Sequence, residues 1–108
     1  METIAIHEKL KEACITGDVD SIRRVLTCDP CSLNFQDRTT GRTPLHRTVM
    51  CWHIEATQFL VESGADPNIQ DIRKMSVLHQ SVENSQVKFV KLLLKHKADP
   101  NLIQEGNH

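Results

Sequence analysis

Apolar residues recur at intervals of three and four along most of the chain, which is the spacing of an amphipathic helix. The pattern is clearest between residues 54 and 61, and a shorter apolar face precedes it at Leu45 and Val49. Residues 87–93 repeat the longer face with the same spacing. The pattern predicts an all-α protein built from pairs of short helices.

Two short motifs return with one period. Thr-Pro-Leu-His at residues 43–46 is followed by Ser-Val-Leu-His at residues 76–79, an offset of 76 − 43 = 33. Gly-Ala-Asp-Pro-Asn at residues 64–68 returns at the same offset as Lys-Ala-Asp-Pro-Asn at residues 97–101. Two motifs that share one period predict a repeated structural unit.

The residues of these motifs are suited to the ends of helices. Thr43 can cap a helix through its hydroxyl, and Pro44 fits the first helical position because its missing N–H has no partner there. Gly64 can end the second helix with a positive φ, and residues 66–68 then turn the chain. A fainter copy of the unit surrounds Gly17 near the start of the chain.

The two motifs at a 33-residue period resemble ankyrin repeats, over roughly residues 5 to 103. The resemblance implies an ankyrin-repeat solenoid of about three helix–turn–helix units joined by β-hairpin-like loops. It also implies that His46 and His79 bond back to the Thr or Ser at the helix start and tie one unit to the next. We expect one domain over residues 1–108, with units at 5–36, 37–70 and 71–103, and with 104–108 as a tail or the start of a truncated unit.

The chain departs from the family pattern at several glycine positions. Trp52 and Ser85 stand where the family has glycine between the two helices, and Lys97 replaces the glycine that ends the second helix. A positive φ at Lys97 would cost about 1 kcal/mol. The last helix has no following unit to cover Leu93 and Leu94. We therefore expect a modestly stable monomer or a weak homodimer.

Composition narrows the class of protein. The chain has 25% charged residues and a net charge of −1, without the basic excess of a nucleic-acid binder. Charged residues interrupt the first 20 positions, so no signal peptide is expected, and no window is apolar enough to span a membrane. The four cysteines are then expected to be reduced thiols. These features predict a cytoplasmic protein, with the nucleus as an alternative.

The sequence gives little support for a catalytic site or a metal site. Cys28 and Cys31 have the spacing of a zinc or redox pair, but no second half-site follows, so a helix end is preferred. His46 and His79 are assigned structural roles rather than metal binding. No nucleophile and base come together, and no glycine-rich phosphate loop is present. We expect no enzyme activity, cofactor or metal.

By resemblance, the loop tips and the ends of the first helices form a concave binding surface. Its basic residues favour an acidic or extended segment of a partner protein. Trp52 is either a partly exposed anchor for that partner or a ring packed over a neighbouring unit. The expected partner-binding residues are Arg38, Thr39, Thr40, Arg42, Met50, Cys51, Trp52, Ile72, Arg73, Lys74, Met75, Glu83 and Asn84.

Asn68 and Asn101 match the position at which an asparaginyl hydroxylase can modify members of this family. The alternative is that both are structural turn residues. The resemblance as a whole implies a protein–protein interaction module that acts as an adaptor, regulator or inhibitor. The alternative function is an N-terminal structural fragment of a longer ankyrin array, which self-associates through its uncapped C-terminal repeat.

Overall fold

The computed structural model describes the backbone of residues 2–101 and the side chains of residues 5–101. Within that range the chain is helical and contains no strand, which confirms the all-α prediction. The predicted tail at residues 104–108 lies outside the described residues. The helices are α1 (Glu2–Thr16), α2 (Val19–Cys28), the 3₁₀ helix η1 (Pro30–Asn34), α3 (Pro44–Met50), α4 (Ile54–Glu62), α5 (Val77–Glu83) and α6 (Val87–Lys95).

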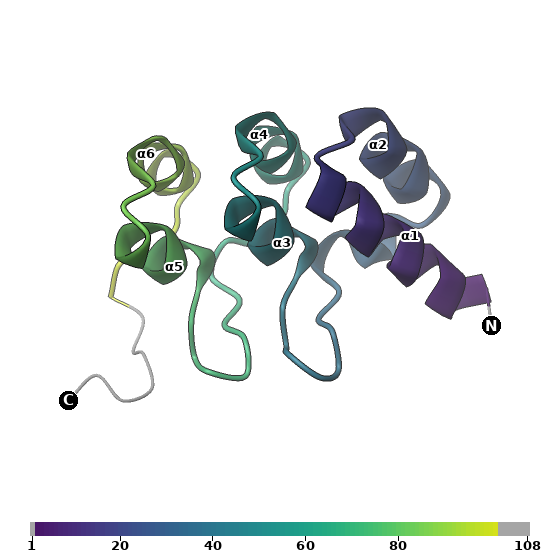
Figure 1. Cartoon of the computed structure of the whole chain (residues 1–108), viewed down its shortest axis with the longest axis horizontal. Helices are drawn as coiled ribbons and strands as arrows, with labels where there is room; N and C mark the ends of the chain where they lie inside the picture. Colours follow the sequence, from purple (N-terminus) through teal and green to yellow (C-terminus); the bar gives the residue numbers. More distant parts are fainter. Residues whose placement is uncertain (1, 102–108) are drawn as a thin grey trace.

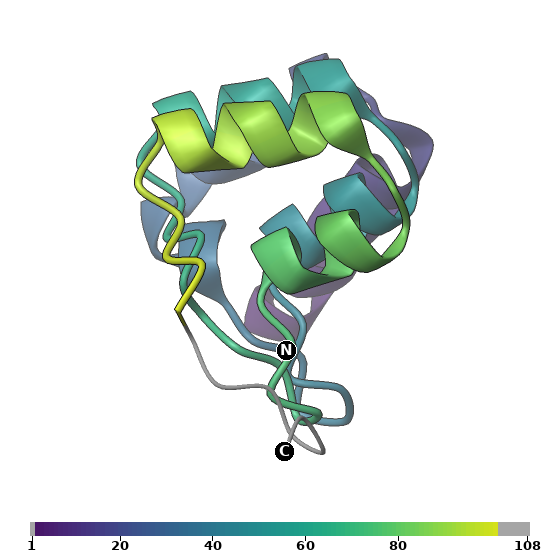
Figure 2. The same cartoon turned by 90° about the vertical axis from the view of Figure 1, so that its left-hand side faces the viewer.

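The helices stack as pairs along one axis (Figure 1). Viewed from the α6 end, α2, α4 and α6 form one layer, and α1, α3 and α5 form the other (Figure 2). The connections from α2 to α3 and from α4 to α5 project away from both layers as loops that lie side by side. None of the helices within residues 2–101 is long and apolar enough to cross a lipid bilayer.

The first helices of the second and third units, α3 and α5, begin where their sequences predict. Thr43 and Ser76 cap α3 and α5, and their hydroxyls accept from the backbone N–H groups of His46 and His79. The histidine side chains bond back to the capping residues, so each helix start is a reciprocal capping box. Pro44 occupies the first turn of α3. The local role predicted for both histidines is therefore confirmed.

The core lies between the two helix layers. Leu10 and Leu45 from the first helices and Leu60 and Leu93 from the second helices are at most 2% exposed. Two polar residues of the first helices, Thr48 and Ser81, are also buried, and each bonds to a carbonyl of its own helix. Thr48, for example, donates its hydroxyl proton to the carbonyl of Leu45 at 3.1 Å. Burial of such hydroxyls costs little because they keep a partner.

The backbone adopts a positive φ at every position where a family glycine is replaced. The turn between the paired helices has φ 77° at Gly17, 62° at Trp52 and 57° at Ser85. At the end of the second helix, φ is 98° at Gly64 and 72° at Lys97. The chain therefore keeps the geometry of the repeat and carries the strain of a side chain in the left-handed region.

The expectation for the outer face of the last helix was wrong in one respect. Leu93 is 0% exposed, because it lies on the same face of α6 as the buried Phe89, four residues earlier. Val87 and Leu94 lie on the opposite face and are 60% and 47% exposed. Together with Val82 at 60%, they form the exposed apolar residues of the last unit.

Candidate protein-interaction surface

Two loops carry most of the residues expected to meet a partner. The loop between η1 and α3 is closed by a backbone hydrogen bond from Asp37 N–H to Arg42 O at 2.9 Å. The next loop is closed in the same way, from Asp71 N–H to Met75 O at 3.0 Å. These are the predicted hairpin-like loops, although neither contains a strand within residues 2–101.

The two loops are held side by side. Ile72 N–H donates to Thr40 O at 3.0 Å, and a Cβ at Gly41 would lie only 2.7 Å from the same nitrogen. Glycine is therefore required at position 41 for the close approach as well as for its φ of 72°. The Gln36 side chain adds a second link, since its amide donates to Gln70 O at 3.1 Å. The tips thus form one continuous surface.

In each loop, an aspartate side chain accepts hydrogen bonds from other residues of the same loop. Asp37 Oδ1 accepts from the backbone N–H and the hydroxyl of Thr39, both at 2.7 Å. These bonds, with further help from the positive charge of Arg47, lower the pKa of Asp37 to about 2. Asp71 is 7% exposed, and its Oδ1 accepts from the N–H groups of Arg73 at 2.8 Å and Met75 at 3.0 Å.

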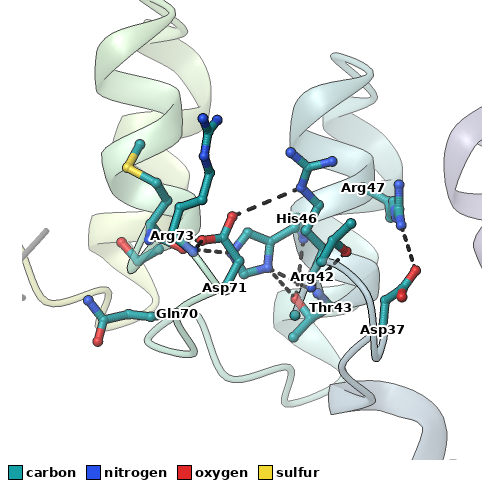
Figure 3. Close-up of polar contacts among 12 residues, drawn as sticks. Asp37, Arg42, Thr43, His46, Arg47, Gln70, Asp71 and Arg73 are labelled. Carbon is teal, nitrogen blue, oxygen red and sulfur yellow. Dashed lines mark hydrogen bonds and ion pairs between the residues drawn. The ribbon is translucent and has the colours of Figure 1, made fainter. Parts of the chain in front are cut away.

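The same two aspartates pair with arginines (Figure 3). Arg47 on α3 donates to Asp37 at 3.0 Å, and Arg42 lies 4.0 Å from Asp71. Both arginines are partly buried, with side chains 15% and 27% exposed. Arg42 therefore contributes to the structure of the loops through its pair with Asp71, and only part of its side chain is exposed to a partner. The exposed cations of the two described tips are Arg38, Arg73 and Lys74.

His46 links its own helix start to the next loop. Its Nδ1 accepts from Thr43 N–H at 3.1 Å, which leaves a proton on Nε2 to donate to Met75 O at 3.0 Å. Burial of the ring is the main cause of its lowered pKa, so the neutral form is favoured in the folded state. The expected bridge from this histidine to the next unit is confirmed.

The second group of expected residues lies at the ends of the first helices. Trp52 is 58% exposed, yet its ring also meets Phe89 of the next unit edge-on, with centroids 6.1 Å apart. Packing of the ring on the neighbouring unit is therefore confirmed, and its role as an anchor for a partner stays a prediction. Met50 and Cys51 are half-buried beside it, and Glu83 and Asn84 at the end of α5 are exposed.

The expected residues thus fall into two groups rather than one cluster. The loop tips lie beyond the N-terminal ends of α3 and α5, and the second group lies at their C-terminal ends (Figure 2). A seven-residue helix such as α3 separates the groups by about 10 Å at 1.5 Å per residue. A partner that contacts both groups must cover the length of these helices.

Sequence reasoning missed a hollow beside the first loop. It has a volume of about 390 Å³ and lies between α1, the loop and α3. Arg38 and Arg42 were among the expected partner-binding residues, but Lys11, Phe35 and Asp37 were not. Alignment of the first unit with the second could have indicated the hollow, because the two units carry different residues at equivalent positions. Its lining residues are His7, Glu8, Leu10, Lys11, Phe35, Asp37, Arg38, Arg42, Thr43, Pro44 and Arg47.

Asn68 has a structural role between units. Its Oδ1 accepts from Asp99 N–H at 2.6 Å, and its amide donates to Lys97 O at 3.2 Å. Asn34 makes the equivalent bond one unit earlier, from Asp66 N–H at 2.9 Å. The turn role of Asn68 is therefore present in the structure. Hydroxylation of Asn68, and of the exposed Asn101, stays a prediction.

The cysteines lie in different environments. Cys28 and Cys31 are exposed at the end of α2 and in η1, whereas Cys14 is buried in α1. Burial raises the pKa of Cys14 to about 12, so its thiol remains protonated and unreactive. In the described part of the chain, no three His, Cys, Asp or Glu side chains are grouped so as to hold a metal ion.

Comparison with known proteins identifies the fold family. The model of ankyrin repeats (3 copies) matches residues 10–104. The chain is 36% identical to inversin of Mus musculus over 95 residues, which cover 88% of this chain and 9% of inversin. Danio rerio inversin is 38% identical over 87 residues, covering 81% of this chain and 8% of that protein.

A third relative is transient receptor potential cation channel subfamily A member 1 of Homo sapiens. It is 28% identical over 109 aligned residues, which cover 100% of this chain and 9% of the channel. The chain thus spans less than a tenth of the length of these curated relatives. The family model, the period of the motifs and the paired helices agree, and the chain belongs to the ankyrin-repeat family.

Proposed function

We propose that this chain binds a partner protein through its two loop tips and the adjoining ends of the first helices, without catalysing a reaction. Ankyrin-repeat domains are in general protein–protein interaction modules. The proposed role is that of an adaptor, regulator or inhibitor that occupies a partner's surface. The exposed thiols of Cys28 and Cys31 suit a reducing compartment such as the cytoplasm.

The tip of the second loop carries the main support for this proposal. Ile72 is 66% exposed, and it is flanked by the exposed cations Arg73 and Lys74. The backbone bond from Ile72 to Thr40 joins this tip to the first one. An apolar side chain held on a fixed loop among cations provides both contact area and charge for a partner with an acidic segment.

The experiment is capture of partners from cell lysate by the tagged chain, with identification by mass spectrometry. The test variant is Arg73→Glu/Lys74→Glu, because both side chains are exposed and the double change leaves the Arg42–Asp71 pair intact. The control variant is Lys88→Glu/Lys91→Glu, which makes the same charge change on the exposed side of α6. Both variants are checked for folding by circular dichroism.

A protein captured by the parent and the control but lost with the test variant would support the proposal. Capture that is equal for all three chains would exclude the exposed cations of the second loop tip from the binding surface. A Trp52→Ala variant then shows whether the second group of residues contributes. Because the ring of Trp52 also meets Phe89, its stability is measured in parallel.

A structural role within a longer array is the second candidate. Val82, Val87 and Leu94 form an exposed apolar set on the last unit, and the relatives are more than ten times longer than the aligned segment. Analytical ultracentrifugation tests this candidate. Concentration-dependent association that is abolished by Val87→Asp/Leu94→Asp would favour it, and a monomer at all concentrations would argue against self-association.

A further inference from the structure

The hollow beside the first loop lies where the first unit has a lysine in place of the bridging histidine of the second unit. Leu10 and Leu45 are equivalent core residues of α1 and α3, so Lys11 stands where the second unit has His46. His46 lies buried under the next loop and bonds to Met75 O. Lys11 instead lines the hollow, and its charge contributes to the lowered pKa of Asp37.

The floor and one wall of the hollow are apolar or aromatic. Leu10 is 2% exposed and forms part of the lining with Pro44. Phe35 is 36% exposed and stacks on His7 of α1, with ring centroids 3.5 Å apart and planes 16° from parallel. This stack fixes the loop against α1 at the edge of the hollow. A volume of about 390 Å³ is at the lower end of ligand-pocket sizes, which run from about 300 to 1,000 Å³.

The rim of the hollow carries more positive than negative charge. Four cations line it, namely Lys11, Arg38, Arg42 and Arg47, against the carboxylates of Glu8 and Asp37. Asp37 is satisfied from within by Thr39 and Arg47, so it offers little charge to a ligand. Arg42 pairs with Asp71 and Arg47 with Asp37, so the lining cations outside these pairs are Lys11 and Arg38, against the single carboxylate of Glu8.

We propose that this hollow binds an apolar side chain of a partner peptide whose flanking residues are acidic. The proposal rests on the proposed function and names the partner's chemistry. The apolar residue packs on Leu10, Phe35 and Pro44, and the flanking carboxylates meet Lys11 and Arg38 at the rim. A nucleic acid fits less well, because its bases would stack on a row of aromatic rings, and Phe35 is the one Phe, Tyr or Trp in the lining of the hollow.

The experiment starts from a random peptide library displayed on phage and selected on the immobilised chain of 108 residues. Enriched peptides are synthesised with a fluorescent label, and their dissociation constants are measured by anisotropy. We expect the enriched peptides to share an apolar residue flanked by Asp or Glu. Their binding should weaken at least about tenfold for Lys11→Glu/Arg38→Glu, because two favourable charge contacts become repulsive.

Two further variants keep this test decisive. Lys11→Gln/Arg38→Gln removes the charges without reversing them and should give a smaller loss in the same direction. Lys88→Glu/Lys91→Glu makes the same charge change on α6 and should leave affinity unchanged. Enriched peptides without acidic residues, or an affinity that Lys11→Glu/Arg38→Glu does not change, would overturn the assignment. So would tighter binding of labelled single-stranded DNA than of the enriched peptides, if it depends on the same two cations.

The outcomes separate this inference from the proposed function. Peptides whose binding is lost with Arg73→Glu/Lys74→Glu but kept with Lys11→Glu/Arg38→Glu would place recognition on the second tip. The proposal that the hollow binds the peptide would then be wrong, and the proposed function would stand. Failure of any peptide to be enriched, together with no partner captured from lysate, would count against both.

Discussion

Replacement of Ser85 by glycine should stabilise the protein. Ser85 connects α5 to α6 with a φ of 57°, in the left-handed region that disfavours a Cβ. The side chain is exposed, and the turn is held by backbone bonds from Ser85 N–H to Val82 O at 3.1 Å and from Gln86 N–H to Ser81 O at 2.8 Å. Glycine keeps both bonds and removes the strain.

The expected gain follows from two opposing terms. Relief of the left-handed conformation is worth about 1–2 kcal/mol. Glycine also gives the unfolded chain more freedom, which costs about 0.4–1 kcal/mol. The net increase in the free energy of unfolding is therefore about 0.5–1 kcal/mol. For a chain of this size, that corresponds to a rise in Tm of about 2–8 °C.

The assay is urea unfolding followed by far-ultraviolet circular dichroism, with Ser85→Ala as the matched control. Alanine also lacks the hydroxyl but keeps the Cβ, so its unfolding free energy should stay within about 0.5 kcal/mol of the parent. The reasoning fails if the two variants unfold at the same urea concentration, since the Cβ would then carry no strain. It also fails if Ser85→Gly is less stable than the parent.

Further predictions concern the glycine turn, the histidines and pH. Gly17→Ala should destabilise the fold by about 2 kcal/mol in urea titrations, because φ is 77° and the new Cβ would lie 2.6 Å from His53 Nδ1. His46→Gln should cost about 2 kcal/mol in the same assay and His79→Gln about 1, since only His46 has the bond to the next unit within the described residues. Burial lowers the pKa of His46, so the unfolded chain takes up a proton at higher pH than the folded chain does. The free energy of unfolding should therefore fall as the pH drops below about 6.5. His46→Gln should flatten this dependence, and an unchanged pH profile in that variant would refute the assignment. Asp37, with a pKa lowered to about 2, should add a second loss between about pH 4 and 2 that Asp37→Asn removes.

The helices and their caps could be predicted from sequence because local chemistry determines them. Thr43 and Ser76 cap their helices as their positions in the motif indicate, and Pro44 occupies the first turn. The positive φ at Lys97 also follows from its alignment with Gly64. These features depend on a few adjacent residues and recur at a fixed period, so the repeat itself provides the evidence for them.

The candidate surface could be predicted only in part, because the remaining features depend on how each loop folds and packs against the helices. The burial of the Asp71 carboxylate follows from the fold of its own loop, where it accepts two backbone N–H groups. The pairing of Arg47 with Asp37 joins residues ten positions apart, and no helical spacing indicates it. The stack of Phe35 on His7 depends on how the first loop returns to α1.

The hydrogen bonds between units also connect the protonation state of the buried His46 to the shape of the candidate surface. Met75 closes the second loop through its carbonyl oxygen, and that same oxygen accepts the proton of His46 Nε2. A second proton on His46 would have to enter at Nδ1, which now accepts from Thr43 N–H. Protonation therefore removes one of the two bonds of the capping box at the start of α3, a few residues from the arginines of the first loop. Acid should thus loosen the surface along with the fold, rather than change the charge of the tips alone.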